Sequence, residues 1–407
     1  MGQTFFRNLT GANCHLAGQA IISLQVSEDV DADYDTASVV TLGPDGLFAI
    51  GSVINTVEGG VSTGWWEVED PVQSVSGEKT WRRREGSAGY AHIPLCSYKL
   101  RRKGYMAARA TLSRGVVPSD DYPPKFMEAG IYNAYRWELY HQWEQGVLDG
   151  FEMRKQLASW RVVGSAAQII QTICGWVGLS FQLRASLPNC AQTYIPVEKP
   201  AIAAIREIAS WSGASVMLDR NGTLQIFDWE EAFARGGGPP NLRALTEYEV
   251  HYGLSSINHV SVVGSTYSQK ESTGTWYRPR QTYPLEVTES LARAPGEKIV
   301  SERIEIRDYV ITPNLARGIA RERLARAWVR SNCTRFMGPA EGAQSVRPLS
   351  GPVLSVNRNL TWNGRAYRYE IAAVFARAAV PFAGAWSSSG YVLQRPGQPA
   401  RVNEGWW

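Results

Sequence analysis

Carboxylates next to tryptophans are the side chains in this sequence that could most readily do chemistry. Glu67, Glu69 and Asp70 follow Trp65-Trp66, and Glu230-Glu231 follow Trp229. Two facing carboxylates beside rings that stack on sugars would suit glycoside hydrolysis. Neighbouring acids on one strand or loop point in different directions, however, and solvated faces commonly carry such runs. We keep a carbohydrate-binding or carbohydrate-cleaving β-protein as an alternative and not as the main prediction.

A second candidate is the alternating run Asp29-Val30-Asp31-Ala32-Asp33-Tyr34-Asp35. Alternate aspartates resemble a calcium-binding loop, but such a loop needs a glycine at its sixth position and a glutamate at its twelfth. Tyr34 and Val40 occupy those positions. The pattern therefore favours a solvated loop or strand edge.

Other catalytic and metal-binding patterns are missing from the sequence. The five histidines (His15, His92, His141, His251 and His259) have no paired spacing, and His259 is better explained as structural. The five cysteines (Cys14, Cys96, Cys174, Cys190 and Cys333) form no CxxC pair, so they indicate neither a zinc site nor a disulfide framework. No phosphate-binding glycine loop and no G-x-S-x-G motif occurs. We predict no catalytic, cofactor-binding or metal-binding residue, no cofactor and no enzymatic activity.

Charge is distributed unevenly along the first third of the chain, although the formal net charge is only +4. Residues 1–78 contain eleven acids and one base, whereas residues 79–115 contain ten bases and one acid. The two blocks could pair between subunits, or the basic block could bind nucleic acid through bases interleaved with Trp81, Tyr90, Tyr98 and Tyr105. Two differently charged solvated faces would explain the pattern equally well.

The bulk composition is that of a folded protein with more than one domain. The chain has 407 residues, of which 44% are hydrophobic and 20% charged. These values argue against disorder and leave room for two to four domains. No run of about 18 apolar residues predicts a membrane span, and the first ten residues do not resemble a secretory signal. We expect a soluble protein that folds in a cytoplasm.

The N-terminal third predicts short strands and then becomes difficult to assign. Residues 21–26 and 37–42 are β-branched runs, and residues 43–46 have turn chemistry. Residues 60–160 combine several tryptophans with the basic block and a proline-rich break at 118–124. A short helix is predicted from Trp137 to Met153, and the rest of this region stays unassigned.

The clearest pattern lies between residues 163 and 229. Ser165 could cap a helix from Ala166 to Val177 that ends at Gly178, and residues 180–183 alternate like a strand. Pro200 starts a second helix, whose buried stripe ends before a Gly213 stop: Ile202, Ile205, Ile208 and Ala209. Residues 214–218 and 223–227 flank Asp219-Arg220-Asn221-Gly222, which predicts a tight hairpin with positive φ at both Asn221 and Gly222.

The C-terminal half begins after the glycine and proline run at 236–240, which predicts a domain boundary. Strands are expected at 257–264, 300–310, 353–356 and 367–374, with a turn at 362–364. Residues 315–328 predict a helix that carries Arg317, Arg321, Arg323 and Arg326. The tail from residue 394 is rich in proline and glycine and ends on Trp406-Trp407.

The segment from Tyr194 to Trp229, YIPVEKPAIAAIREIASWSGASVMLDRNGTLQIFDW, resembles the helix-plus-hairpin of phage tail hub proteins. In that family a strand with a V-x-V pattern follows an asparagine, and Asn258 to Gly264 fits it. The preceding helix and the later arginine-rich helix also come in the family's order. The resemblance covers roughly residues 160–375 and is firm over 165–264, whereas residues 65–160 have no counterpart.

The resemblance implies an α+β, mainly β fold in which a small α/β domain bridges two tail-tube-like β-barrels. We expect an N-terminal barrel domain at 1–160 with a Trp-rich basic insertion and an α/β helix-plus-hairpin domain at 161–235. A second barrel at 241–395, with its Arg-rich helix at 314–330, and a tail at 396–407 would complete the chain.

The resemblance also implies a function as a structural hub of a phage tail tip or baseplate. Such a hub is a homotrimeric ring that joins the tail tube to a central spike or fibre and surrounds the DNA-ejection channel. Its partners would be the tail tube or distal tail protein, the tape-measure protein and the spike or fibre. Genomic DNA would pass without specific binding. The protein would be assembled in the bacterial host cytoplasm and reside in the virion.

Overall fold

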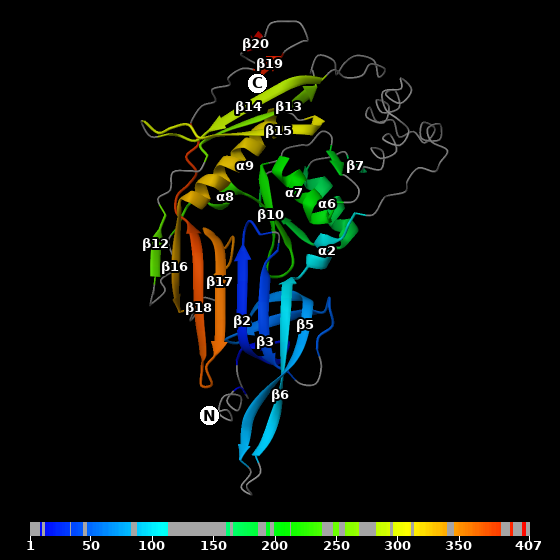
Figure 1. Cartoon of the computed structure of the whole chain (residues 1–407). Coiled ribbons are helices and arrows are strands. Elements are labelled where there is room, and N and C mark those ends of the chain that lie inside the picture. Colours follow the sequence, from blue (N-terminus) through cyan, green and yellow to red (C-terminus); the bar gives the residue numbers. More distant parts are fainter. Residues whose placement is uncertain are drawn as a thin grey trace, which may run out of the picture.

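In the computed structural model the chain is elongated, with a barrel at one end, helices in the middle and a small sheet at the other end (Figure 1). The structure describes residues 9, 13–32, 34–43, 47–82, 88–112, 160–162, 166–185, 193–195, 199–211, 213–237, 247–251, 257–267, 282–293, 296–310, 313–339, 346–383, 391–393 and 401–403. The predicted helix at 137–153, the Ser165 cap and Trp406-Trp407 lie outside these ranges.

The N-terminal strands close a six-stranded barrel. They are β1 (His15–Leu16), β2 (Gln19–Asp29), β3 (Thr36–Leu42), β4 (Val53–Glu58), β5 (Val61–Arg82) and β6 (Ala88–Arg102). Their order is β1-β4-β5-β6-β3-β2, and pairing of β1 with β2 closes the ring. β2 and β3 largely alternate buried and less buried residues, as expected for strands with one face toward a core.

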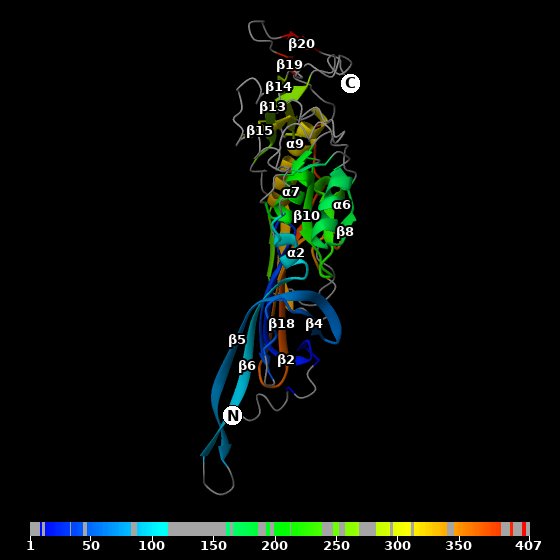
Figure 2. The same cartoon turned by 90° about the vertical axis from the view of Figure 1, so that its right-hand side faces the viewer.

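β5 and β6 are longer than the other barrel strands, and the two run past the barrel as a two-stranded ribbon (Figure 2). Their register continues from Trp66↔Arg102 out to Arg82↔Ala88. This ribbon accounts for part of the Trp-rich region that sequence patterns left unassigned.

Four C-terminal strands extend the sheet of the barrel. They are β12 (Glu247–Val250), β16 (Cys333–Pro339), β17 (Val353–Trp362) and β18 (Tyr367–Ala376). β17 pairs with β2, and the order continues β17-β18-β16-β12, which makes a ten-stranded sheet. The described parts of these four strands form no second closed ring of their own.

The middle of the molecule is the α/β part that the sequence predicted. It contains α6 (Ala166–Val177), β8 (Phe181–Leu183), α7 (Ala201–Trp211), β10 (Ala214–Leu218), β11 (Leu224–Asp228) and α8 (Trp229–Ala232). Beside it lie α2 (Tyr105–Arg109) and the pair β7 (Trp160–Val162) and β9 (Thr193–Ile195). The predicted stripe of Ile202, Ile205, Ile208 and Ala209 is buried. Gly178 and Gly213 follow the helices with positive φ, so both predicted stops are confirmed.

The hairpin between β10 and β11 exists, but its turn differs from the predicted one. Gly222 has φ of +81°, whereas Asn221 is absent from the residues with positive φ. Gly222 N–H donates to Asp219 O, and Asp219 N–H donates to Thr223 O, which gives a three-residue loop built on a type I turn. The Asp219 carboxylate accepts hydrogen bonds from the N–H groups of Asn221 and Thr223. These bonds stabilise the turn, so a second residue with positive φ is not needed.

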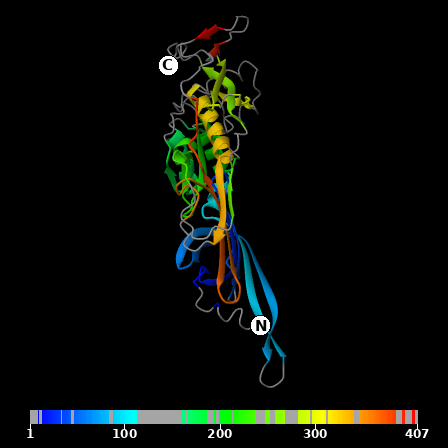
Figure 3. The same cartoon turned by 90° about the vertical axis from the view of Figure 1, so that its left-hand side faces the viewer.

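The far end of the molecule contains a three-stranded sheet and a long helix. The elements are β13 (His259–Tyr267), β14 (Thr282–Ser290), β15 (Ser301–Val310) and α9 (Pro313–Ser331). The short strands β19 (Tyr391–Leu393) and β20 (Arg401–Asn403) pair nearby. α9 runs along the long axis and leads directly into β16 (Figure 3). It buries one stripe: Leu315, Ala316, Ile319, Ala320, Leu324, Ala325 and Val329.

The predicted class is confirmed: the fold is α+β and mainly β, with a closed barrel and a small α/β part. The domain limits at 160, 235 and 395 remain a prediction. None of the helices described is long and apolar enough to span a bilayer.

Gly222→Val should lower the free energy of unfolding by about 1–2 kcal/mol or more, because a β-branched residue is strained at positive φ. A Cβ at this position would also lie 2.8 Å from Lys103 O. Gln225→Ala in the same hairpin is unsuitable as a control, because Gln225 is buried and bonds Asp219 and Arg184.

Gly175→Ala is the matched control for thermal or chemical unfolding. Gly175 lies within α6, and a Cβ there meets nothing within 4 Å. We expect it to stabilise the protein by roughly 0.5–1 kcal/mol. Equal melting temperatures for Gly222→Val and the native chain would show that the turn is wrongly placed.

Candidate functional site

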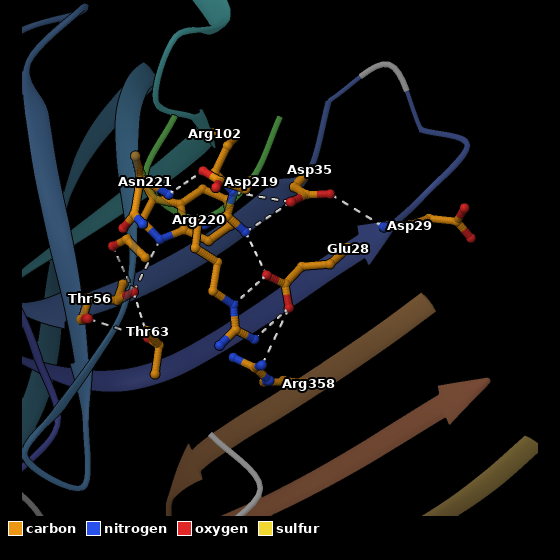
Figure 4. A network of polar contacts seen from close by, with 12 residues as sticks. Glu28, Asp29, Asp35, Thr56, Thr63, Arg102, Asp219, Arg220, Asn221 and Arg358 are labelled. Carbon is orange, nitrogen blue, oxygen red and sulfur yellow. Dashed lines mark hydrogen bonds and ion pairs between the residues drawn. The ribbon is translucent and has the colours of Figure 1, made fainter. Parts of the chain in front are cut away.

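A single carboxylate, that of Glu28 on β2, accepts hydrogen bonds or ion pairs from three arginines (Figure 4). Arg102 Nη2 lies 2.7 Å from Oε1, and Arg220 donates from Nε to Oε1 and from Nη2 to Oε2, both at 2.9 Å. Arg358 Nη2 lies 3.3 Å from Oε2. All four side chains are buried. The three arginines come from β6, the β10–β11 turn and β17, so one carboxylate joins the barrel, the α/β part and the C-terminal strands.

Asp35 is a second buried carboxylate at the same place, at the end of the loop between β2 and β3. Arg102 donates from Nε to Asp35 Oδ2 at 3.1 Å, and Arg102 Nη2 lies 3.0 Å from the same oxygen. The backbone N–H of Asp29 donates to Oδ1. Glu28 and Asp35 therefore share the Arg102 guanidinium.

The ring of Trp66 also holds Arg102 in place, and the absence of a side chain at Gly64 leaves room for the Arg102 guanidinium. Its guanidinium carbon lies 3.8 Å from the centroid of Trp66, which suits a cation–π contact. A Cβ added to Gly64 would collide with Arg102 Nη1. Because Glu28, Asp35 and Trp66 hold the guanidinium in place, it has no room to yield, so glycine is required at position 64.

Burial and charge act in opposite directions on the titration of these groups. Burial raises the pKa of Asp35 to about 7, against the opposing effect of Arg102 and reinforced by Glu28. Burial acts to lower the pKa of Arg358, but Glu28 and other anionic neighbours, including Glu58, raise it above its usual value. Glu58 is itself buried and accepts a 2.7 Å bond from Thr63 Oγ1. Three buried carboxylates and three buried guanidinium groups thus lie at or near this junction, and each affects the titration of its neighbours.

The hairpin turn is what brings Arg220 to Glu28. Arg220 is one of the turn residues that Asp219 organises, and its own carbonyl accepts the N–H of Trp65 on β5 at 2.8 Å. Arg220 and Arg358 both donate to the carbonyl of Val346, at 2.9 and 2.6 Å. The turn is therefore attached to the end of the barrel by main chain as well as by charge.

The sequence favoured a solvated loop or strand edge for the aspartates after Glu28. Asp29 does end β2 and the side chains of Asp29 and Asp31 are partly exposed, but they also bind the last turns of α9. Arg330 pairs with both Asp29 and Asp31, and Arg326 pairs with Asp31 at 2.9 Å. Arg206 of α7 donates to the carbonyl of Ala32. No local pattern could reveal these contacts, since Arg330 lies about three hundred positions from Asp31. We call residues 28–35 the acidic segment.

The other arginines of α9 bind acids from neighbouring elements. Arg317 pairs with Glu289 of β14, Arg321 with Glu230 of α8, and Arg323 with Glu302 of β15, at 2.7–2.9 Å. These side chains are partly exposed, so each pair adds modest stability. The arginine pattern of this helix therefore fixes its orientation among its neighbours.

Four of the five carboxylates proposed beside tryptophans, all but Glu231, have described structural partners. Glu67 accepts the N–H groups of Gly104 and Met106, both at 2.7 Å, at the start of α2. Glu69 pairs with Arg101 and Asp70 with Lys99. Glu230 binds Arg321, as above. The structure brings Trp66 and Trp229 into the core, away from any sugar-stacking position.

The two charge blocks meet within one chain, because β5 and β6 are paired. Asp70, Glu69, Glu28 and Asp35 of the acidic block bind Lys99, Arg101 and Arg102 of the basic block. Tyr98 and Tyr105, proposed as base-stacking residues, are buried. The side chains of Trp81 and Tyr90 lie outside the description. The described part of the blocks thus stabilises the subunit itself.

The remaining candidates are also placed. His259 Nδ1 lies 2.7 Å from Ser290 Oγ across β13 and β14. Burial raises the pKa of the Cys174 thiol to about 12, which makes it unreactive. Within the described ranges no three His, Cys, Asp or Glu side chains are grouped to hold a metal ion.

Two solved structures of tail proteins are similar to this chain over nearly its whole length. The tail protein from Neisseria meningitidis MC58 superposes with a TM-score of 0.54 at 10% identity, covering 91% of this chain and 97% of that one. The chain shares the fold of tail proteins. The 43 kDa tail protein of prophage MuSo2 from Shewanella oneidensis gives a TM-score of 0.51 at 12% identity, covering 89% and 97%. No protein-family model and no curated protein matches the sequence.

Glu28→Gln should lower the free energy of unfolding by about 3–5 kcal/mol, because it removes the buried anion that three arginines share. The matched control is Glu370→Gln. Glu370 pairs with Arg368 on the surface, so its loss should change stability by less than about 0.5 kcal/mol. Chemical denaturation measures both, and similar small effects of the two variants would contradict a central role for Glu28.

Proposed function

We propose that this chain is a non-enzymatic structural hub of a phage tail tip or baseplate. The proposal rests on one observation: the fold matches two tail proteins across about nine-tenths of this chain and 97% of each of theirs. Because the match spans almost the whole of each protein, little of the chain is left over for an added enzymatic domain.

Within this proposal the subunit forms a homotrimeric ring around the DNA-ejection channel. The ring joins the tail tube or distal tail protein to a central spike or fibre, and the tape-measure protein is a further partner. The subunit is made in the host cytoplasm and ends in the virion, where genomic DNA passes without specific binding. The ion pairs that Lys99, Arg101 and Arg102 form with carboxylates of the same chain support this last point for these three bases.

Imaging of the assembled tail tip tests the ring. We expect three copies around a channel aligned with the tube. Because association depends on the concentration of subunits, the purified chain is expected to be monomeric when dilute. A six-copy ring, a single copy, or a location on peripheral fibres would each reject the proposal.

The purified chain should hydrolyse neither peptidoglycan nor other polysaccharides nor peptides. The candidate carboxylates Glu67 and Glu230 are held by main-chain N–H groups and by Arg321, which supports this expectation. Product release is measured with the native chain and with Glu231→Gln. An activity that the native chain shows and Glu231→Gln lacks would favour the carbohydrate-cleaving alternative.

A further inference from the structure

Two buried carboxylates, Glu28 and Asp35, share one guanidinium at the place where three parts of the chain meet. Arg102 Nη2 lies 2.7 Å from Glu28 Oε1 and 3.0 Å from Asp35 Oδ2. The exposed fractions of the two acid side chains are 1% and 4%. Like charges that share a dry site favour the uptake of a proton by one of them.

We propose that Asp35 is a proton-controlled latch, which holds the β10–β11 hairpin firmly on the barrel when protonated and weakens that junction when ionised. The latch lies within a single subunit, so it holds or fails independently of the proposed function in a tail.

Asp35 is the member of the pair that changes its charge. Glu28 receives three guanidinium groups, whereas the only guanidinium with a described bond to the Asp35 carboxylate is that of Arg102. The anion of Glu28 is therefore compensated far better than that of Asp35. The pKa of Asp35 agrees with this assignment, because burial raises it to about 7.

The other charged groups around Asp35 are already engaged. From β2 and its loop, Asp29 and Asp31 bind Arg330 and Arg326 of α9. Arg206 of α7 donates to the main chain of the acidic segment. Arg220 and Arg358 bind Glu28, and the charge of Glu58 helps to raise the pKa of Arg358.

On the outer side of the segment, Tyr34 packs edge-to-face on Tyr105, whose ring lies near Arg101 and Arg109. Arg101 pairs with Glu69. Apart from Arg102, none of the described cations faces the Asp35 carboxylate within bonding distance, so no second one takes up its charge.

The hairpin is the element that opening would release. It covers the acid pair through Arg220, and its turn touches Lys103 and Gly104 beside Arg102. When the hairpin lifts, water reaches Asp35 and its carboxyl returns toward the ordinary pKa of 3.8. The closed state therefore binds the proton more tightly than the open state. Its stabilisation is complete below about pH 4 and is lost as the pH rises through about 7.

Hydrogen exchange of the hairpin amides, residues 214–228, measures this opening in the full-length chain. After correction for the intrinsic pH dependence of exchange, we expect the opening equilibrium to rise by up to about tenfold per pH unit between pH 5 and 7, as for one linked proton. Above pH 7 it should level off. An opening equilibrium that does not change with pH, or that falls, overturns the proposal.

Asp35→Asn is the decisive variant, because it keeps the shape of the side chain and removes its charge. The variant should fold, and its hairpin at pH 7.5 should be at least as protected as the native hairpin is at pH 5.5, with no further loss of protection as the pH rises. Failure of this variant to fold at pH 5.5 also overturns the proposal, since a neutral residue 35 is the state assigned to the closed junction.

Asp70→Asn provides the matched control. Asp70 pairs with Lys99 on the surface of the same barrel, with half of its side chain exposed. In this variant the opening equilibrium of the hairpin should depend on pH as it does in the native chain. If Asp35→Asn keeps that dependence too, the linked proton binds elsewhere and the latch is wrong.

Discussion

The shared carboxylate of Glu28 is the interaction on which the arrangement of this molecule depends. Each of its three arginine partners belongs to a segment that is distant from it in sequence. Burying these charges costs free energy, and a buried ion network is often no more stabilising than apolar packing of the same volume. Its contribution here is to orientation: the donors of three guanidinium groups fit one carboxylate in few arrangements. Apolar clusters on either side supply the driving force, including Val30, Phe227 and Trp229 around the junction.

The acidic segment extends this constraint along the chain. Within a few residues it contacts the barrel through Asp35, the hairpin and β17 through Glu28, and α9 through Asp29 and Asp31. α9 in turn binds acids of β14, β15 and α8. The position of the far sheet is thus linked to the barrel through a row of arginines on one helix.

The sequence predicted the parts of the fold whose signals are local. The helices, glycine stops and hairpin of residues 166–228 were predictable, because periodicity and turn chemistry are properties of neighbouring residues. It did not predict the turn type, because the Asp219 carboxylate supplies what a second positive-φ residue would have supplied. It did not predict the junction either. Asp31 and Arg330 look like solvated residues of a loop and a helix until a fold brings them together. The local sequence signal that could have pointed to the junction was Arg220, a charged residue at the tip of a predicted hairpin.

The pairing of β2 with β17 determines when during synthesis this subunit can become complete. β2 leaves the ribosome well before its partner strand, because β17 and Arg358 follow more than three hundred residues later. Until then residues 23–29 of β2 lack a neighbour on the edge that β17 will cover, and Glu28 lacks one of its three cations. Contacts of such long sequence separation form slowly, and unpaired strand edges promote aggregation. A nascent chain must therefore keep β2 from other unpaired edges until β17 has been translated.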